Sequence, residues 1–217
     1  MAAVAASLLR APPAIYPITD RTLGAASHAE LTRALVRGGA AWVQVRDKGM
    51  AGVALLAAVR AALVEARAGG AKLIVNDRLD VALAAGADGV HLGDEDLPVA
   101  AARRLAGAEF LIGTSTHDVE QALRAQELPC DYVALGPVFA TSSKKDARPA
   151  LGLEALRRVR AGSAKPLVAI GGITRERLPE VLTAGADSVA LIAAVMVPGE
   201  VENCMAELLR LAANVRG

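Results

Sequence analysis

The stretch "AAGADGVHLGD", residues 84–94, joins a helix end, a glycine and a short apolar run that ends in polar residues. Glycine suits the left-handed conformation that terminates a helix. The same arrangement, with glycine or an equivalent helix stop, recurs in "RGGAAWVQVRD" at 37–47, "LPCDYVALGP" at 128–137 and "TAGADSVALIA" at 183–193. Because the apolar runs are short and continuous, these segments predict strands of a sheet that is buried on both faces.

Four further apolar runs bring the expected strands to eight. They are "IYPITD" at 15–20, "KLIVND" at 72–77, "FLIGTST" at 110–116 and "PLVAIGG" at 166–172. Helical patterns separate the strands, and strict strand–helix alternation predicts parallel strands with right-handed crossovers. Eight such units in 217 residues predict an α/β fold, a compact (β/α)8 TIM barrel, with an open doubly wound sheet as the alternative.

The domain organisation is expected to be simple, because the chain shows no linker or low-complexity segment. We expect one barrel domain over residues 14–217 and an N-terminal extension over residues 1–13, "MAAVAASLLRAPP". The only charge of that extension, Arg10, follows its apolar run, whereas a secretory signal places its positive charge first. No apolar run approaches the roughly 18 residues of a membrane span.

Composition narrows the classes of partner. Aromatic residues make up 2% of the chain and hydrophobic residues 53%, so we expect a core of Ala, Val, Leu and Ile. The scarcity of rings disfavours a nucleic-acid binder that stacks bases. A net charge of +1 provides no global field for polyanions or membranes. Cys130 and Cys204 stand far apart, which disfavours a disulfide scaffold or a zinc site and fits a cytoplasmic protein.

In a barrel of this kind the chemistry lies where the strands end. In "VQVRDK", Gln44 and Arg46 are two residues apart and therefore face the same side of a strand, with Lys48 in register beyond them. A glutamine, a guanidinium and an ammonium at one barrel mouth predict an anion site. The alternative is a charged strand end that faces water, which the depth of Gln44 in its strand disfavours.

Carboxylates follow two neighbouring strands, in "VNDRLD" and "GDED". Mg²⁺ takes carboxylate oxygens, usually one or two from the protein together with substrate phosphates. Asp77 and Asp96, with Asn76 beside them, are therefore candidates for such a site. The alternative for Asp77 is a helix cap. Other carboxylates that leave the assignment open are Asp80, Asp94 and Glu95.

The segment "GTSTH" places Ser115 close to His117. The pair suggests nucleophilic catalysis, but no third, orienting acid is evident, so a hydroxyl that hydrogen-bonds a phosphate is favoured. A helix start capped by Ser115 or Thr116 is the alternative. His91 is expected to fill or brace the barrel rather than to bind a metal.

Two later strand ends predict phosphate binding. The glycines of "IGGIT" allow a ligand to approach the backbone, and the loops after strands seven and eight of barrels often hold phosphate on backbone N–H groups. A tight turn is the alternative. The loop "ATSSKKD" offers Thr141, Ser142 and Ser143 as donors and Lys144 or Lys145 as charge. It predicts a lid over an anionic ligand, with a solvated surface loop as the alternative.

Taken together, "VQVRDK", "LIVNDRLDVALAAGADGVHLGDEDLP", "IGTSTH", "DYVALGPVFATSSKKDA" and "PLVAIGGIT" resemble the thiamine-phosphate synthase family. The resemblance covers about residues 15–196 and is specific as an ordered set, not in any single motif. That family joins 4-amino-2-methyl-5-pyrimidinylmethyl diphosphate to a thiazole phosphate and gives thiamine phosphate and pyrophosphate, with Mg²⁺. The reaction is dissociative and uses no protein nucleophile.

The resemblance also implies roles for individual residues. The groups that would hold the pyrimidine diphosphate are Arg46, Lys48, Asn76, Ser115 and Lys144, and those that would bind Mg²⁺ are Asp77 and Asp96. The groups that would hold the thiazole phosphate are Thr141, Ser143, Gly172, Ile192 and Ala193. Gln44 would contact the pyrimidine or its diphosphate. The chain departs from the family at Ala193, where Ser is common, and in "GDED", where "GQED" is usual; the latter adds the Asp94 carboxylate near the metal.

Two alternatives to a synthase stay open. A related thiazole tautomerase uses the same barrel but has a histidine where this chain has Pro137, and it lacks the second Lys–Asp of "KKD". The residues present here favour the synthase. A barrel that only binds a thiamine precursor is the second alternative. We expect small-molecule substrates and neither nucleic acid nor membrane as partners, and surface helices rich in Ala and Leu are compatible with a homo-oligomer.

Overall fold

The computed structural model describes residues 11–141 and 148–216, in which eight parallel strands close into a barrel in chain order. The strands are β1 (Ile15–Thr19), β2 (Trp42–Val45), β3 (Lys72–Asn76), β4 (Gly89–Leu92), β5 (Leu111–Thr116), β6 (Tyr132–Leu135), β7 (Leu167–Ile170) and β8 (Ser188–Leu191). Each coincides with one of the eight strands expected from the sequence. β1 pairs with β8, which closes the sheet and excludes the open doubly wound alternative.

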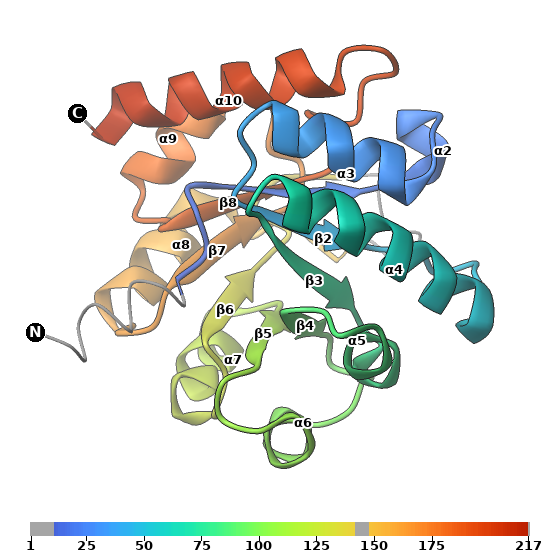
Figure 1. Cartoon of the computed structure of the whole chain (residues 1–217). Helices are drawn as coiled ribbons and strands as arrows, with labels where there is room; N and C mark the ends of the chain where they lie inside the picture. Colours follow the sequence, from blue (N-terminus) through green and yellow to red (C-terminus); the bar gives the residue numbers. More distant parts are fainter. Residues whose placement is uncertain (1–10, 142–147, 217) are drawn as a thin grey trace, which may run out of the picture.

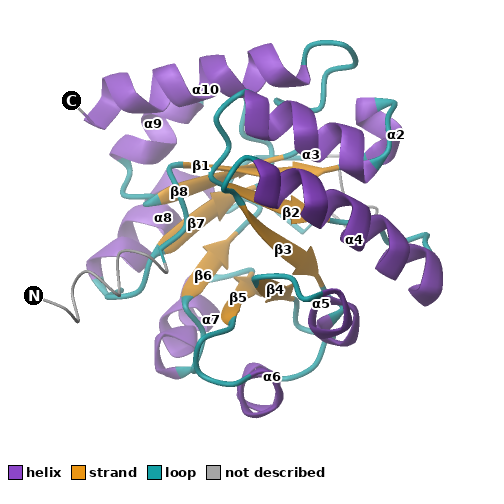
Figure 2. Ribbon diagram, viewed as in Figure 1, coloured by secondary structure: helices purple, strands orange, loops and turns teal. Residues whose placement is uncertain are grey.

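Helices surround the barrel and connect its strands (Figure 1). They are α2 (Arg21–Gly24), α3 (His28–Arg37), α4 (Gly52–Ala68), α5 (Leu79–Ala85), α6 (Val99–Ala106), α7 (Val119–Arg124), α8 (Gly152–Ala161), α9 (Leu178–Thr183) and α10 (Val201–Arg216), with a 3-10 turn at Ala125–Glu127. Figure 2 shows the strands in orange inside the purple helices, with teal loops at their ends. No helix of the described ranges combines the length and the apolar character needed to cross a membrane.

The core has two layers of different composition. Between strands and helices it is aliphatic, as expected from the composition. Inside the barrel, however, Tyr16, Trp42 and Tyr132 pack edge to face, with ring centroids 5.9–6.0 Å apart. Because alternate residues of each strand point inward, the few rings of this chain gather in one place. The expectation of a core without aromatic residues is therefore wrong for the barrel interior.

Gly86 stops a helix, as the sequence predicts. Gly86 ends α5 in the left-handed conformation, with φ of 72°, and its N–H donates to Leu83. β4 begins three residues later, so the helix stop sets where the strand enters the barrel. Most of the predicted N-terminal extension, residues 1–10, lies outside the described ranges.

Candidate active site

Three neighbouring strand ends bring four of the candidate residues together. Arg46 and Lys48 follow β2, Asp77 follows β3 and Asp96 lies beyond β4. The Lys48 ammonium lies 3.6 Å from Asp77 Oδ2. The carboxyl of Asp96 is within hydrogen-bonding reach of Asp77, and Arg46 is near enough to interact with Asp77 electrostatically. Two carboxyl groups and two cationic side chains therefore share one part of the rim.

The environment of Asp77 is unusual for a carboxyl group. Burial and the neighbouring Asp96 carboxyl raise its pKa, although Lys48 and Arg46 favour ionisation. Its backbone is left-handed, with φ of 65°, a conformation that non-glycine residues adopt at a cost of about 1–3 kcal/mol and that concentrates at functional sites. The helix-cap alternative is wrong, because α5 begins after Arg78 and has no side-chain cap.

The competing carboxylates have other partners. Asp80 pairs with Arg78, with the closest oxygen and nitrogen 2.6 Å apart. Asp94 accepts a hydrogen bond of 2.6 Å from Gln121 Nε2 and lies 3.2 Å from Arg148 Nη2. Asp94 is the carboxylate of "GDED" that was expected to add charge near the metal. It is instead paired with Gln121 of α7 and with Arg148, which follows β6.

The Asp77–Asp96 pair fits the preference of Mg²⁺ for oxygen ligands. This ion commonly takes one or two protein carboxylates and completes its shell with water and substrate phosphates. Two carboxyls held close enough to raise a pKa are stabilised by a divalent cation between them. The described residues include no cluster of three or more His, Cys, Asp or Glu side chains that could hold a metal.

A chain of hydrogen bonds crosses the barrel interior below this rim. Gln44 Nε2 donates to the Tyr16 hydroxyl at 3.0 Å, and the two tyrosine hydroxyls are 3.0 Å apart. His91 Nδ1 lies 3.1 Å from the Tyr132 hydroxyl, and its Nε2 lies 2.9 Å from Ser115 Oγ. The chain therefore links two candidate residues, Gln44 and Ser115, from opposite sides of the barrel.

His91 braces the interior, as expected, because both ring nitrogens are engaged and the ring stacks on Tyr132 with centroids 5.5 Å apart. Ser115 faces this ring and not His117, whose Nδ1 lies 2.8 Å from the Gly136 carbonyl. The alternative of a helix capped by Ser115 or Thr116 is wrong, since Asp118 caps α7.

The opposite side of the rim is built from glycine and backbone. Gly171 and Gly172 both have positive φ, 100° and 63°. A Cβ on Gly171 would collide with Pro137, and one on Gly172 with the carbonyl oxygen of Ala140. The missing side chains thus allow the segments after β6 and β7 to touch, so the tight packing that the sequence left as an alternative is present here.

The remaining candidate residues are placed as follows. Asn76 is the last residue of β3 and is half-buried. Ile192 and Ala193 follow β8 at the start of a turn in which the Ile192 carbonyl accepts from Val195 and Met196. Thr141 is half-buried at the edge of the described range. Ser143 and Lys144 lie outside the described residues.

Sequence reasoning missed the two tyrosines of the interior chain. The available signal was strand register: Tyr16 and Tyr132 occupy inward positions of strands whose bounds were predicted. Sequence reasoning also missed α2, which has only four residues. It assigned no role to Asp47, which contacts Arg21, His28 and Gly49.

A closed parallel barrel whose polar loops gather acids and bases at one rim defines a (β/α)8-barrel enzyme. Residues 15–195 match the family model of thiamine monophosphate synthase. The chain belongs to this family. It is 52% identical over 188 residues to the thiamine-phosphate synthase of Methanoculleus marisnigri, covering 86% of this chain and 89% of the relative.

Solved structures agree with this assignment. The thiamine phosphate pyrophosphorylase of Pyrococcus furiosus superposes with a TM-score of 0.88 at 38% identity, over 96% of this chain and all of that one. The (S)-3-O-geranylgeranylglyceryl phosphate synthase of Thermoplasma acidophilum superposes with a TM-score of 0.68 at 15% identity, over 94% of each chain. The second likeness shows the barrel fold alone.

Proposed function

We propose that the protein is a thiamine-phosphate synthase. It joins 4-amino-2-methyl-5-pyrimidinylmethyl diphosphate to a thiazole phosphate and releases pyrophosphate. The observation that carries this proposal is the meeting of Lys48 and Arg46 with the Asp77–Asp96 pair. A site that handles only a monophosphate needs no such combination, whereas a departing diphosphate needs cationic donors and a divalent ion.

The residues of this part of the rim act on the leaving group. Negative charge builds on the diphosphate as its bond to the pyrimidinylmethyl carbon breaks, and fixed donors that meet this charge lower the barrier. Arg46 and Lys48 supply such donors from the chain after β2, and Asn76 at the end of β3 and Ser115 on β5 supply further polar groups. Mg²⁺, bound by Asp77 and Asp96, would neutralise phosphate charge. The thiazole nitrogen then captures the carbon, so no protein nucleophile is required.

The buried Gln44 holds the pyrimidine end of the substrate in this proposal. Its amide is oriented by Tyr16, and the interior hydrogen-bond chain continues to Ser115. The phosphate of the thiazole lies on the other side, against Thr141, Ser143, Gly172 and the backbone of Ile192 and Ala193. That division keeps the two anionic ends of the reactants apart while their reacting atoms meet.

Pyrophosphate release tests the proposal directly. With both substrates and Mg²⁺ we expect release that EDTA abolishes and that omission of the thiazole phosphate reduces sharply. A tautomerase or a barrel that only binds a precursor releases none with any combination. Absence of release from well-folded protein with both substrates would therefore reject the synthase.

Lys144 is assigned from the sequence and its resemblance. Lys144→Ala should slow pyrophosphate release far more than it weakens binding of the thiazole phosphate, because its charge would meet the leaving group. The neighbouring Lys145→Ala is the matched control. Equal kinetics for the two variants would argue against a specific role for Lys144 in the lid.

A further inference from the structure

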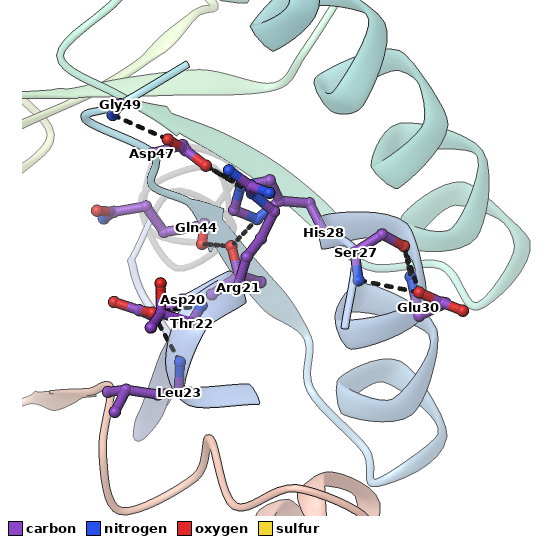
Figure 3. A network of polar contacts seen from close by, with 11 residues as sticks. Asp20, Arg21, Thr22, Leu23, Ser27, His28, Glu30, Gln44, Asp47 and Gly49 are labelled. Carbon is purple, nitrogen blue, oxygen red and sulfur yellow. Dashed lines mark hydrogen bonds and ion pairs between the residues drawn. The ribbon is translucent and has the colours of Figure 1, made fainter. Parts of the chain in front are cut away.

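His28 is a buried histidine that the proposed reaction does not use. Its side chain has no exposed area. Nδ1 lies 2.8 Å from Thr19 Oγ1. Nε2 lies 3.3 Å from Asp47 Oδ2, and Figure 3 shows the His28 ring beside Asp47. The three residues come from the end of β1, the first turn of α3 and the loop after β2. One ring therefore joins two neighbouring loops of the rim.

The start of α3 fixes the position of this ring. Ser27 and Glu30 form a capping box, in which Ser27 Oγ accepts from the Glu30 N–H and the Glu30 carboxylate accepts from the Ser27 N–H. His28 is the first residue of the helix, where the positive end of the helix dipole disfavours an imidazolium. Burial lowers the pKa of His28 as well, although Asp47 opposes this. The ring is thus held neutral.

A neutral imidazole carries one N–H, and its neighbours decide which nitrogen bears it. Nε2 faces the Asp47 carboxylate, which only accepts, so the proton belongs on Nε2. Nδ1 is then an acceptor for the hydroxyl of Thr19, whose single proton is shared between this nitrogen at 2.8 Å and the Gln44 carbonyl oxygen at 3.3 Å. The hydrogen bonds consequently run in one direction, from Thr19 to His28 to Asp47.

Asp47, which His28 holds in place, in turn fixes the backbone that follows β2. Its Oδ2 also accepts from Arg21 Nε at 2.7 Å, and its Oδ1 accepts from the Gly49 N–H at 2.9 Å. Burial opposes ionisation of Asp47, but the hydrogen bonds from Arg21, Gly49 and His28 outweigh it and lower its pKa. The carboxylate is therefore ionised and held in one orientation, with a turn closed over residues 47–49.

The turn has Arg46 on one side and contains Lys48, whose ammonium lies 3.6 Å from Asp77 Oδ2. We propose that Thr19, His28 and Asp47 are positioning residues, which hold Arg46 and Lys48 in place for the diphosphate leaving group. The hydrogen bonds of the His28 ring go to Thr19 and Asp47, so His28 acts on Arg46 and Lys48 through Asp47. The kinetic consequence rests on the proposed function, whereas the structural one, a turn set by His28, does not.

The kinetic test compares His28→Ala with Thr32→Val. Thr32 lies on the same helix, is fully buried, and its hydroxyl finds no hydrogen-bond partner among the residues described. We expect His28→Ala to raise KM for the pyrimidine diphosphate or lower turnover by about 10- to 100-fold, the usual cost of a misplaced catalytic group or its support. KM for the thiazole phosphate should stay within about twofold of wild type, since the misplacement affects one side of the rim.

His28→Gln provides a rescue. A glutamine amide at this position can donate to Asp47, so this variant should recover part of the loss in His28→Ala. If Thr32→Val is as impaired as His28→Ala, or if both substrates lose affinity equally, His28 has only a structural role and the proposal is overturned.

Two further measurements do not depend on turnover. Calorimetry with inorganic pyrophosphate and Mg²⁺ should show weaker binding to His28→Ala than to Thr32→Val. The amide resonance of Gly49 should shift in His28→Ala and stay in place in Thr32→Val. Failure of wild-type protein to bind pyrophosphate would count against the proposed function, whereas an unmoved Gly49 resonance in His28→Ala would overturn the positioning role.

Discussion

On the side of the rim formed by β2, β3 and β4, the polar groups are side chains that hold one another. Lys48 meets Asp77, Asp77 meets Asp96, and Asp47 ties the preceding turn to His28. On the side formed by β6, β7 and β8, the described residues include glycines packed against neighbouring backbone, one of which also contacts Arg177, and a turn after Leu191. We call these the side-chain half and the backbone half of the rim.

The difference teaches how two anions can be recognised in one small barrel. A leaving diphosphate gains charge during the reaction, so it is best met by fixed charges and a divalent ion. A monophosphate that only has to be held is adequately served by backbone N–H groups, which carry partial charges and need little space. Substitutions should therefore affect the two halves in different ways.

The largest effect is expected on the side-chain half. Asp77→Ala should lower Mg²⁺-dependent turnover by about 100- to 1,000-fold, because it removes a ligand of the ion that would meet the developing charge, and loss of one such stabilising contact has about this cost. Steady-state pyrophosphate release over a Mg²⁺ titration measures this. Asp80→Ala is the matched control, because Asp80 pairs with Arg78 and not with the site; a comparable loss there would contradict the assignment.

On the backbone half, Gly172→Ala should destabilise the fold by about 1–3 kcal/mol, because it combines a strained φ with a collision. Gly70→Ala is the control, since Gly70 has φ of 72° but a Cβ added to it would meet no atom within 4 Å. Chemical denaturation gives both free energies of unfolding. KM for the thiazole phosphate should rise in Gly172→Ala alone. Equal destabilisation by the two substitutions would show that the close approach of Gly172 to Ala140 does not contribute to stability.

Acid pH should act first through the side-chain half. The pKa of His28 is lowered by burial, so its contribution to stability is present above the ordinary value of about 6.5 and is lost as pH falls through the folded-state value. The charged groups that face the ring, Asp47, Arg21 and Asp20, remain in a His28→Gln variant. Thermal unfolding should show a smaller loss below about pH 6.5 in this variant; parallel curves would contradict a neutral buried ring.

The smallest effect is expected for Asp94→Asn. Asn retains an acceptor for Gln121, and the partly exposed pair with Arg148 contributes only about 0–1 kcal/mol. The Mg²⁺ concentration for half-maximal turnover should stay near wild type, and Asp96→Asn should raise it. If Asp94→Asn raised it as much as Asp96→Asn, the metal site would extend beyond the two proposed carboxylates.

The sequence predicted the barrel more fully than it predicted the site. Short apolar runs, four of them after a recurring helix stop and four in the gaps between, located all eight strands, because buried parallel strands have few other patterns. The convergence of Lys48, Asp77 and Asp96 followed from the topology, since parallel strands end at one rim. The left-handed backbone of Asp77 and the contacts of His28 could not be foreseen, because they depend on how neighbouring loops pack.

The backbone half illustrates the same limit. The pair Gly171–Gly172 was visible as a motif, but glycine serves both ligand approach and close packing, and only coordinates reveal the contacts with Pro137 and Ala140. Conversely, Asp94 attracted attention as an added carboxylate, and its partners Gln121 and Arg148 are 27 and 54 residues away. Distant partners of this kind leave no local pattern in a sequence.

In the proposed site, Asp77 and Asp96 hold one divalent cation beside Arg46 and Lys48. A crystal grown with Mn²⁺ in place of Mg²⁺ and with pyrophosphate tests this most directly, because Mn²⁺ can be located by its anomalous signal. We predict a single peak within coordination distance of both carboxylates and of a pyrophosphate oxygen, with Arg46 and Lys48 on the other oxygens. Pyrophosphate bound elsewhere, or bound at this rim with Mn²⁺ away from Asp77 and Asp96, would contradict the account.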